Sequence, residues 1–482
     1  MKQIDWSFLS MPRIAVALVL LFSQVFAQVF TQAFAQDTPP ATEQKALDLE
    51  NNFCETAPTD QLCSYLPHDV TDFSASFVYR LIIPSAQNPF DLFSWKSFIA
   101  LNWPTDAKDH PQRNRIGADP EAPRVWNHYK NPAQLFDLPA DNVCADRPGN
   151  KSILVTDEFI QATGQPLIDR NLNYVVYDVR VNPVVAEYID TNGLESVAGQ
   201  SAFKNSGIPI EFPMGHYTNV EARTGGSVGA LEIKSAWRIL QPHSKDDLRR
   251  YHTVNGLIAI DGKNTITGEP LCVKTKLGLV GMHIMHRTQS GNGDDWIWTT
   301  FEHIDNVPTA DNARGPNSIF AEELFPGGCQ IANPPENRYS FYQKDCRNCK
   351  TNWIDSQARQ SWKWSSLAPF AATAVAENGY GVQAVRCWKP SLGTQAINQI
   401  WQQKLSGTVW ANYQLLTTQW KGANKDLMFP NGEVPRYLTN STIETYIQTN
   451  HDGTCLGCHS TATSTAQQSA NFTFVLNRVS PQ

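Results

Sequence analysis

Residues 271–288, with the sequence LCVKTKLGLVGMHIMHRT, form the longest β-like run of the chain. Similar runs precede and follow it at residues 253–260 and 296–304. The intervening sequences DGKN (261–264) and SGNGDD (290–295) have the composition of tight turns, because Gly, Asn and Asp accept the backbone angles that turns require. Consecutive strands joined in this way are built most simply as an antiparallel meander.

Two segments upstream, residues 173–181 and 229–240, are also expected to be strands, since the first is β-rich and the second alternates apolar and polar side chains. Residues 105–150 carry many Pro, Asp and Asn residues without sustained periodicity, so we expect long loops there. The sequence therefore predicts an α+β fold that is mainly β, in which a large antiparallel sheet carries long loops.

A short helix is expected before the sheet. Asn88 followed by Pro89 is typical of a helix start, because Pro fits the first helical position. Apolar residues then recur at helical spacing at Leu92, Trp95 and Ile99. This spacing predicts an amphipathic helix whose aromatic face packs in the core.

The chain changes character after residue 390. Thr394 is expected to cap a helix, and a strand is expected after Gly407, with alternate side chains from Val409 to Leu415 on one face. Further on, Ser441 and Glu444 match a capping box, which predicts another helix just before the last cysteines. We therefore expect a β-rich body over residues 36–390 and a small helical segment, residues 391–482, packed on it.

The first 35 residues resemble a secretory signal. Lys2 and Arg13 flank its start, an apolar run covers residues 14–27, and small-residue cleavage sites follow at Ala27 and Ala35. The apolar run is shorter than the roughly 20 residues that cross a bilayer. We expect export to the periplasm of a Gram-negative bacterium and no membrane span after removal of the signal.

The amino-acid composition and the absence of certain motifs argue against several classes of function. The chain is 41% hydrophobic with 14 Trp, so a large buried core is expected. Its net charge is −7, and no run of basic residues interrupts the sequence, which argues against nucleic acid as a partner. Motifs for phosphate loops, serine hydrolases or zinc proteases do not occur.

The chain has 10 cysteines, and an exported protein is expected to pair most of them. Eight lie outside the last cysteine motif and allow several connectivities: Cys54, Cys63, Cys144, Cys272, Cys329, Cys346, Cys349 and Cys387. The unit Cys346-Arg-Asn-Cys349-Lys350 is interpreted as a disulfide-stapled loop. A deprotonated Lys350 acting as a haem ligand is the alternative.

The motif Cys455-Leu-Gly-Cys458-His459 matches the Cys-x-x-Cys-His pattern that attaches a c-type haem. Two thiols about one helical turn apart can both reach the vinyl groups of a porphyrin, and the adjacent His459 can bind the iron as proximal ligand. A disulfide between the two cysteines is one alternative, and half of a zinc site completed by Cys346 and Cys349 is another. The sequence predicts one covalent haem c.

The second axial ligand must come from upstream, because the residues after His459 contain neither Met nor His. Met428 is the preferred candidate, since it lies in a loop shortly before Cys455. Ligation by Met would raise the reduction potential relative to two His ligands and close the iron to small substrates.

Other candidates for this ligand come from the β-rich body. Met214 lies in a Phe-Pro-Met-Gly turn. In the strand at residues 271–288, His283 and Met285 would share one face, and Met282 and His286 the other.

Several separated stretches carry a resemblance to a family: WKSFIALNWP (95–104), EIKSAWR (232–238), LVGMHI (279–284), WTTFEH (298–303) and ETY (444–446). In these stretches the chain resembles the uncharacterised bacterial cytochrome c family proteins, in which a large exported body ends in one c-type haem site. The resemblance implies haem binding at Cys455, Cys458 and His459 in a periplasmic setting. It supplies no substrate.

Three functions are compatible with these patterns. The preferred one is electron transfer by a periplasmic monohaem cytochrome that exchanges electrons with a redox partner protein or a small-molecule donor or acceptor. The second is a haem enzyme of peroxidase or oxygenase type with an open distal position. The third is a ligand-binding module in which the haem is structural.

Overall fold

The structure is a computed structural model. It describes residues 61–70, 87–113, 115–138, 142–144, 153–161, 164–240, 246–289, 296–316, 325, 328–332, 338–344, 350–353, 362–371, 383–421, 433–449 and 453–479. All of these belong to one compact unit, Asn52–Gln482. The expected secretory signal, Met428, Cys54, Cys346 and Cys349 lie outside the described residues.

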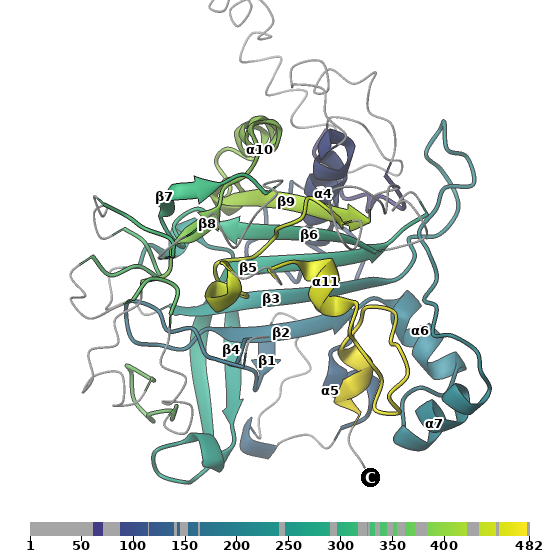
Figure 1. The fold of residues 1–482 in the computed structure, drawn as a ribbon, viewed down its shortest axis with the longest axis horizontal. Coiled ribbons are helices and arrows are strands. Elements are labelled where there is room, and N and C mark those ends of the chain that lie inside the picture. The colour runs from purple at the N-terminus through teal and green to yellow at the C-terminus, as the bar shows by residue number, and fades with distance from the viewer. Residues whose placement is uncertain are drawn as a thin grey trace, which may run out of the picture. The chain divides into compact units, whose positions relative to one another are not determined.

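An eight-stranded sheet forms the centre of the described fold (Figure 1). Its strands are β1 (Ile153–Thr156), β2 (Val176–Val181), β3 (Leu231–Leu240), β4 (Thr253–Ile260), β5 (Leu271–Arg287), β6 (Trp296–His303), β9 (Tyr413–Lys421) and β10 (Glu433–Val434). A separate parallel pair consists of β7 (Thr309–Arg314) and β8 (Arg386–Trp388). The expected α+β, mainly β class is confirmed.

The helices are short and lie around this sheet. They are α4 (Gln87–Leu101), α5 (Pro132–Leu135), α6 (Pro183–Thr191), α7 (Val197–Asn205), α10 (Leu392–Lys404) and α11 (Cys455–His459). Single 3-10 turns add η1 (Val125–His128), η2 (Asn142–Cys144), η4 (Leu248–Arg250), η5 (Gly262–Asn264), η7 (Val409–Asn412), η8 (Thr445–Ile447) and η9 (Val475–Arg478). Within the described part of the chain, no helix is both long and apolar enough to cross a membrane.

Strand β5 organises the sheet. Its residues 276–278 pair with both β3 and β4, and its residues 281–286 pair with both β3 and β6. Strand β3 therefore takes one edge of β5, while β4 and β6 share the other edge. The predicted antiparallel meander is confirmed for β4, β5 and β6, and β6 then pairs antiparallel with β9.

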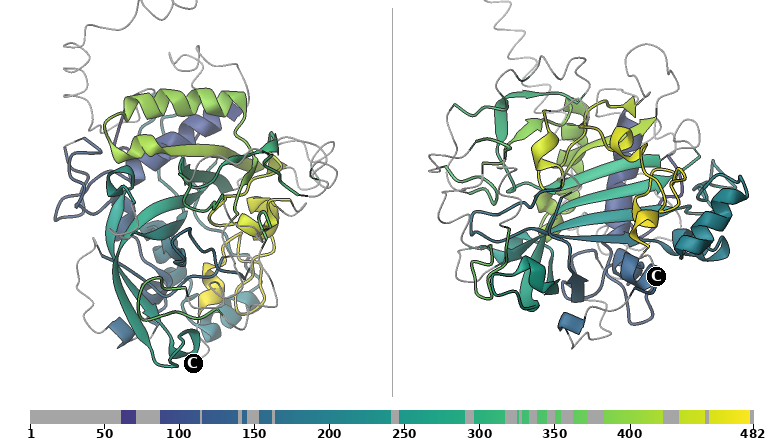
Figure 2. Two further views of the ribbon diagram at one scale, coloured as in Figure 1. Left: turned by 90° about the vertical axis from the view of Figure 1, so that its left-hand side faces the viewer. Right: turned by 60° about the horizontal axis from the view of Figure 1, so that its bottom comes forward.

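The two faces of the sheet are covered by different parts of the chain (Figure 2). On β5, Met282 and His286 point towards α4, as shown by their contacts with Asn102 and Phe93. Their neighbour His283 points the other way and pairs with Glu444. We call the first side the helix face and the second, covered by the described residues 435–449 and 453–479, the C-terminal face.

Helix α4 begins at Gln87, close to the predicted start, but it is not amphipathic. Its buried residues include polar ones on every side, because α4 is enclosed between the sheet and α10. Buried Asp91 accepts hydrogen bonds from Gln87 Nε2 (2.6 Å), Thr394 Oγ1 (2.7 Å) and Thr418 Oγ1 (2.8 Å). Burial outweighs these bonds and raises the pKa of Asp91 to about 6.

Two predicted boundaries in the C-terminal part are wrong. Helix α10 is capped by Ser391, whose Oγ accepts from the backbone N–H of Thr394 at 3.1 Å. The Thr394 hydroxyl is used by Asp91 instead. The expected strand from Val409 starts only at Tyr413, because residues before it form the 3-10 turn η7.

The predicted capping box is also wrong. Residues after Ser441 form turns and the short 3-10 turn η8, not an α-helix. The Glu444 carboxylate accepts a hydrogen bond from the Asn440 backbone N–H (2.9 Å) and pairs with His283, so it cannot cap the backbone N–H of Ser441. Glu444 therefore pairs with His283, which is distant in sequence, and not with its neighbour Ser441.

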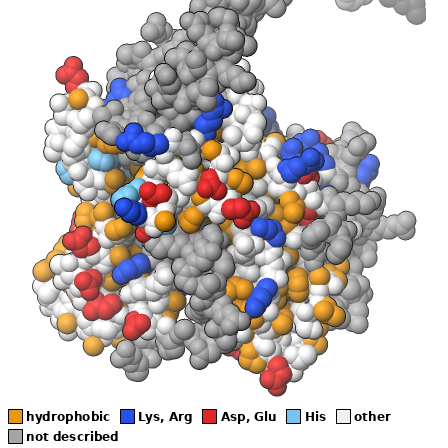
Figure 3. All heavy atoms as spheres, turned by 180° about the vertical axis from the view of Figure 1, so that it is seen from behind, with side chains coloured by type: hydrophobic (Ala, Val, Ile, Leu, Met, Phe, Trp, Pro, Cys, Tyr) orange, Lys and Arg blue, Asp and Glu red, His pale blue; other side chains and the backbone are white. Residues whose placement is uncertain are grey.

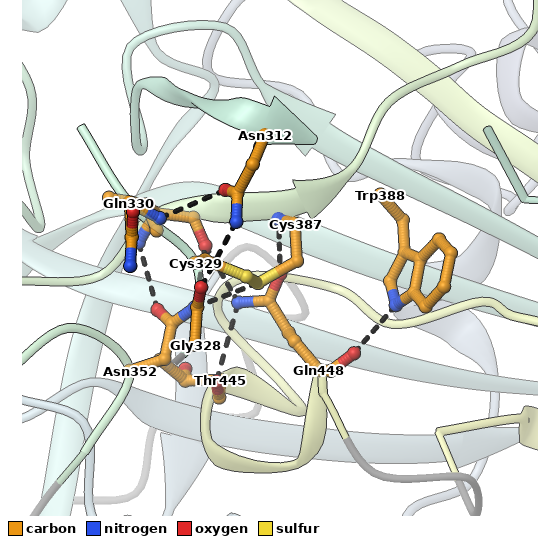
Figure 4. The surroundings of a disulfide bond; sticks show 10 residues. Asn312, Gly328, Cys329, Gln330, Asn352, Cys387, Trp388, Thr445 and Gln448 are labelled. Atoms are coloured by element: carbon orange, nitrogen blue, oxygen red, sulfur yellow. Dashed lines mark hydrogen bonds between the residues drawn. A yellow bond between two sulfur atoms is a disulfide. The ribbon is translucent and has the colours of Figure 1, made fainter. Parts of the chain in front are cut away.

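Two disulfides are described, Cys144–Cys272 and Cys329–Cys387, as expected for these four cysteines. Figure 4 shows the second one beside Gln448, whose Oε1 accepts from the Cys387 backbone N–H at 3.0 Å. Cys63 is also disulfide-bonded. Lys350 is exposed and lies over the Trp353 ring at 4.6 Å, which gives no support to the alternative that it is a haem ligand.

The surface seen from behind the sheet carries mixed charges. Figure 3 shows Lys and Arg side chains interspersed with Asp and Glu on this face, between apolar and neutral polar groups. No large area of one sign gathers among the residues coloured there.

Candidate functional site

Helix α11 holds the cysteine motif and is anchored on β9 by one side chain. Buried Gln419 accepts a hydrogen bond from the Leu456 backbone N–H (2.9 Å) and donates to Thr454 Oγ1 (2.7 Å) and to the Pro435 carbonyl (2.9 Å). These bonds join the start of α11 to the preceding chain and to the sheet. The motif is therefore integrated with the β-rich body, as we expected.

The two cysteines differ in exposure. Cys455 is buried in a hydrophobic cluster on the C-terminal face, and its thiol donates to the Leu438 carbonyl at 3.7 Å. Cys458 is exposed, and its backbone N–H bonds to the Thr454 carbonyl at 3.1 Å within the same helical turn. The Cys455 thiol thus faces the protein, whereas Cys458 lies at the surface of the body.

His459 has a defined tautomer. Its Nδ1 lies 2.8 Å from the Phe472 carbonyl oxygen. Since a carbonyl can only accept, Nδ1 carries the proton and Nε2 keeps the lone pair. The ring packs against Trp298 (4.3 Å between centroids) and Phe474 (4.8 Å).

This environment suits a metal ligand. Burial lowers the pKa of His459 to about 4, so the imidazole is neutral near neutral pH, and metal binding requires the neutral form. Ligating His residues in proteins usually donate their other N–H to a carbonyl or carboxylate, which fixes the ring. The residues present therefore fit a c-type haem with His459 as proximal ligand.

The candidates for the second axial ligand are divided between the two faces. Met282 and His286 lie on the helix face, where Met282 Sδ accepts from Asn102 Nδ2 (3.7 Å) and His286 Nε2 donates to the Val228 carbonyl (2.5 Å). The sheet separates both from α11. His283 and Met285 lie on the C-terminal face, and Met285 belongs to the same hydrophobic cluster as Cys455.

Two further candidates have no described contact with the site. Met214 is half-buried in the turn next to Gly215, which bridges to Thr288 beyond the end of β5. Met428 stays a prediction.

A cluster of titratable residues on the C-terminal face, formed by Lys234, His283 and Glu444, is not predicted by the sequence. His283 Nε2 lies 3.1 Å from both carboxylate oxygens of Glu444. Burial by itself raises the pKa of Glu444, but His283, Lys234 and the hydrogen bonds hold it below its usual value. Lys234 is the cross-strand neighbour of His283 on β3 and lies over the Tyr177 ring at 5.3 Å.

The same three residues act on His459. Lys234, His283 and Glu444 lie on the C-terminal face, and all three contribute electrostatically to the pKa of His459. The alternation of side chains along residues 271–288 predicts which face of the strand His283 occupies. No sequence pattern predicts its pairing with Glu444, because the spacing of Glu444 from Ser441 matches that of a helix cap.

Comparisons with protein-family models, with curated proteins and with solved structures found no match to this chain. Among the described residues, no group of three or more His, Cys, Asp or Glu side chains is arranged to hold a metal ion.

Proposed function

We propose that the chain binds one haem c covalently through Cys455 and Cys458, with His459 as the proximal iron ligand, and that it carries electrons in the periplasm. The observation that carries this proposal is the hydrogen bond between His459 Nδ1 and the Phe472 carbonyl at 2.8 Å, which leaves Nε2 to bind iron. Bound haem would supply one-electron chemistry at its iron.

The chain's own residues would perform two tasks. Gln419 fixes α11 against β9, so the two thiols and the imidazole keep a constant relation to the sheet. Trp298 and Phe474 pack on the His459 ring and hold it in place. The two described disulfides are consistent with an exported chain. Covalent haem attachment in a bacterium is consistent with export as well.

The test is the mass and spectrum of protein exported from a bacterial host that has a c-type haem maturation system. After acid-acetone extraction, the intact mass should exceed that of the processed chain by one haem. The double variant Cys455→Ala/Cys458→Ala should lose this added mass, whereas Ser460→Ala, a change at the exposed end of α11, should retain it. Haem that extracts completely from the unaltered protein would refute the proposal.

The carrier form of this function predicts a low-spin ferric iron. If Met428 is the second ligand, the ferric protein should show the weak long-wavelength charge-transfer band of Met ligation, and Met428→Ala should abolish it. Met282→Leu, on the helix face, is the matched control and should leave the band unchanged.

A haem enzyme with an open distal position is the second candidate; Lys234, His283 and Glu444 lie on the side of His459, so they would tune the proximal ligand and would not transfer protons to a distal substrate. An open iron would be high-spin and would bind cyanide or peroxide readily. A low-spin iron that excludes cyanide would favour the carrier.

A further inference from the structure

The turn that orients His459 has a strained backbone. Asn471 has φ 50° and Phe472 has φ 70°, both in the left-handed region. Asn adopts this conformation readily, but it is unusual for a bulky aromatic residue such as Phe472. Strain of this kind persists only where surrounding contacts fix it, and it often marks a functional site.

Two buried side chains from different strands fix this turn. Trp296 on β6 donates its indole N–H to Asn471 Oδ1 at 3.1 Å. Glu232 on β3 accepts a hydrogen bond from Thr473 Oγ1 at 2.5 Å. Because β5 lies between β3 and β6, the turn spans that strand on the C-terminal face and is held at both ends.

The anchored turn fixes the position of one atom of the site, the carbonyl oxygen of Phe472. The Phe472 carbonyl, between the two anchored residues, accepts the Nδ1 proton of His459. The Thr473 hydroxyl also accepts from the Val475 backbone N–H (3.0 Å), which directs its own proton towards Glu232. The Phe474 ring, next in sequence, packs on the imidazole. Releasing either anchor would let the carbonyl turn away from His459.

We propose that Glu232 and Trp296 are positioning residues for the iron ligand: they hold the strained turn 471–473 so that the Phe472 carbonyl fixes the tautomer and basicity of His459. This inference rests on the proposed haem site. A firm Nδ1–H···O bond makes Nε2 a more basic ligand, which stabilises ferric iron. Loosening the turn should therefore raise the reduction potential.

The variant Thr473→Val tests this with little change in volume, because it removes only the bond to Glu232 and the cap of Val475. Thr465→Val is the matched control: Thr465 lies in the same C-terminal segment and donates to buried Gln200 at 2.6 Å, away from the turn. Thr473→Ser, which keeps the hydroxyl, should restore the unaltered behaviour if the bond itself matters. Trp296→Phe removes the other anchor.

The first measurement is the reduction potential of the haem-loaded protein. Thr473→Val and Trp296→Phe should shift it upwards, while Thr465→Val and Thr473→Ser should leave it where it is in the unaltered protein. An equal shift in Thr473→Val and Thr465→Val would show a general packing effect and overturn the inference.

The second measurement does not need the haem. In the full chain carrying Cys455→Ala/Cys458→Ala, the nitrogen chemical shifts of His459 should show the Nδ1–H tautomer, and adding Thr473→Val should give a mixture of tautomers. An unchanged Nδ1–H tautomer in that variant would overturn the inference. If the unaltered chain fails to bind haem but the tautomer changes as expected in Thr473→Val, the proposed function is refuted and the positioning role stays intact.

Discussion

The two faces of the sheet bury polar groups in different ways. On the helix face, Asp91 accepts three hydrogen bonds and lies between regular helices. On the C-terminal face, the chain is irregular and is held by the polar side chains of Gln419, Glu232 and Glu444. The helix face thus acts as a scaffold, whereas the polar contacts of the C-terminal face fix the positions of α11 and His459.

The largest effect is expected from the core of the helix face. Trp95 is fully buried, contacts Phe98 and Phe301, and donates to Asn398 Oδ1 at 2.9 Å. Trp95→Ala should lower the free energy of unfolding by about 3–5 kcal/mol, since it leaves a large cavity. Leu392→Ala, at an exposed position on α10, should change it by less than about 0.5 kcal/mol. Denaturant titration measures both, and equal effects would contradict the assignment of the core.

A pH dependence on both faces should come next. Burial raises the pKa of Asp91 to about 6 and that of Glu232 to about 7. A raised carboxyl pKa means that the protonated form is favoured in the folded state. Each of these carboxyls therefore adds to the free energy of unfolding below its unfolded pKa, and this contribution is lost as pH rises towards its folded pKa. Each loss is about 3 kcal/mol between pH 4 and 7.

The variants Asp91→Asn and Glu232→Gln separate the two contributions. Each should flatten the part of the unfolding curve against pH that its carboxyl causes, and the steep part of the Glu232 curve should extend to higher pH than that of Asp91. A curve that keeps its slope in Asp91→Asn would show that this carboxyl is not the titrating group.

The sequence predicts the elements that depend on local patterns, but not the contacts between segments that are distant in the chain. The β4, β5 and β6 meander follows from turn residues between neighbouring segments, and α4 follows from its Asn88-Pro89 start. The placement of β9 beside β6 brings together segments far apart in sequence, so no local pattern predicts it. Ser391 and Thr394 are both good caps, and only the tertiary partner Asp91 decides between them.

The candidate site shows the same division. The spacing of Cys455, Cys458 and His459 is a local pattern, and it was read directly from the sequence. The atom that orients His459 is a backbone carbonyl in a left-handed turn, and any residue type supplies a carbonyl. Its two anchors come from β3 and β6, so their role depends on the sheet topology and not on spacing.

A smaller effect on stability, but a specific one on the site, is expected at Gln419. Gln419→Leu removes the partners of the Leu456 N–H and of Thr454 Oγ1 while keeping a side chain of similar size. The free energy of unfolding should fall by about 1–3 kcal/mol, the cost of a buried polar group left unsatisfied. The yield of covalent haem should fall as well, because α11 loses its link to β9. Asn398→Leu, a similar change at a buried amide beside the helix face, should destabilise without lowering haem yield in the protein that folds.

The smallest effect concerns one donor on the helix face. The Thr394 hydroxyl donates to Asp91 Oδ2 at 2.7 Å, so Thr394→Val removes one of three hydrogen bonds to that carboxyl. The variant should lose about 1 kcal/mol of unfolding free energy at neutral pH, and Thr394→Ser should lose less. Because the lost bond favoured the ionised form, the pKa of Asp91 should rise further, and the loss of stability with increasing pH should continue to a higher pH than in the unaltered protein. A shift of that transition to lower pH would mean that the hydroxyl accepts a proton from Asp91 instead of donating to it, which would reverse the polarity assigned to the helix-face network.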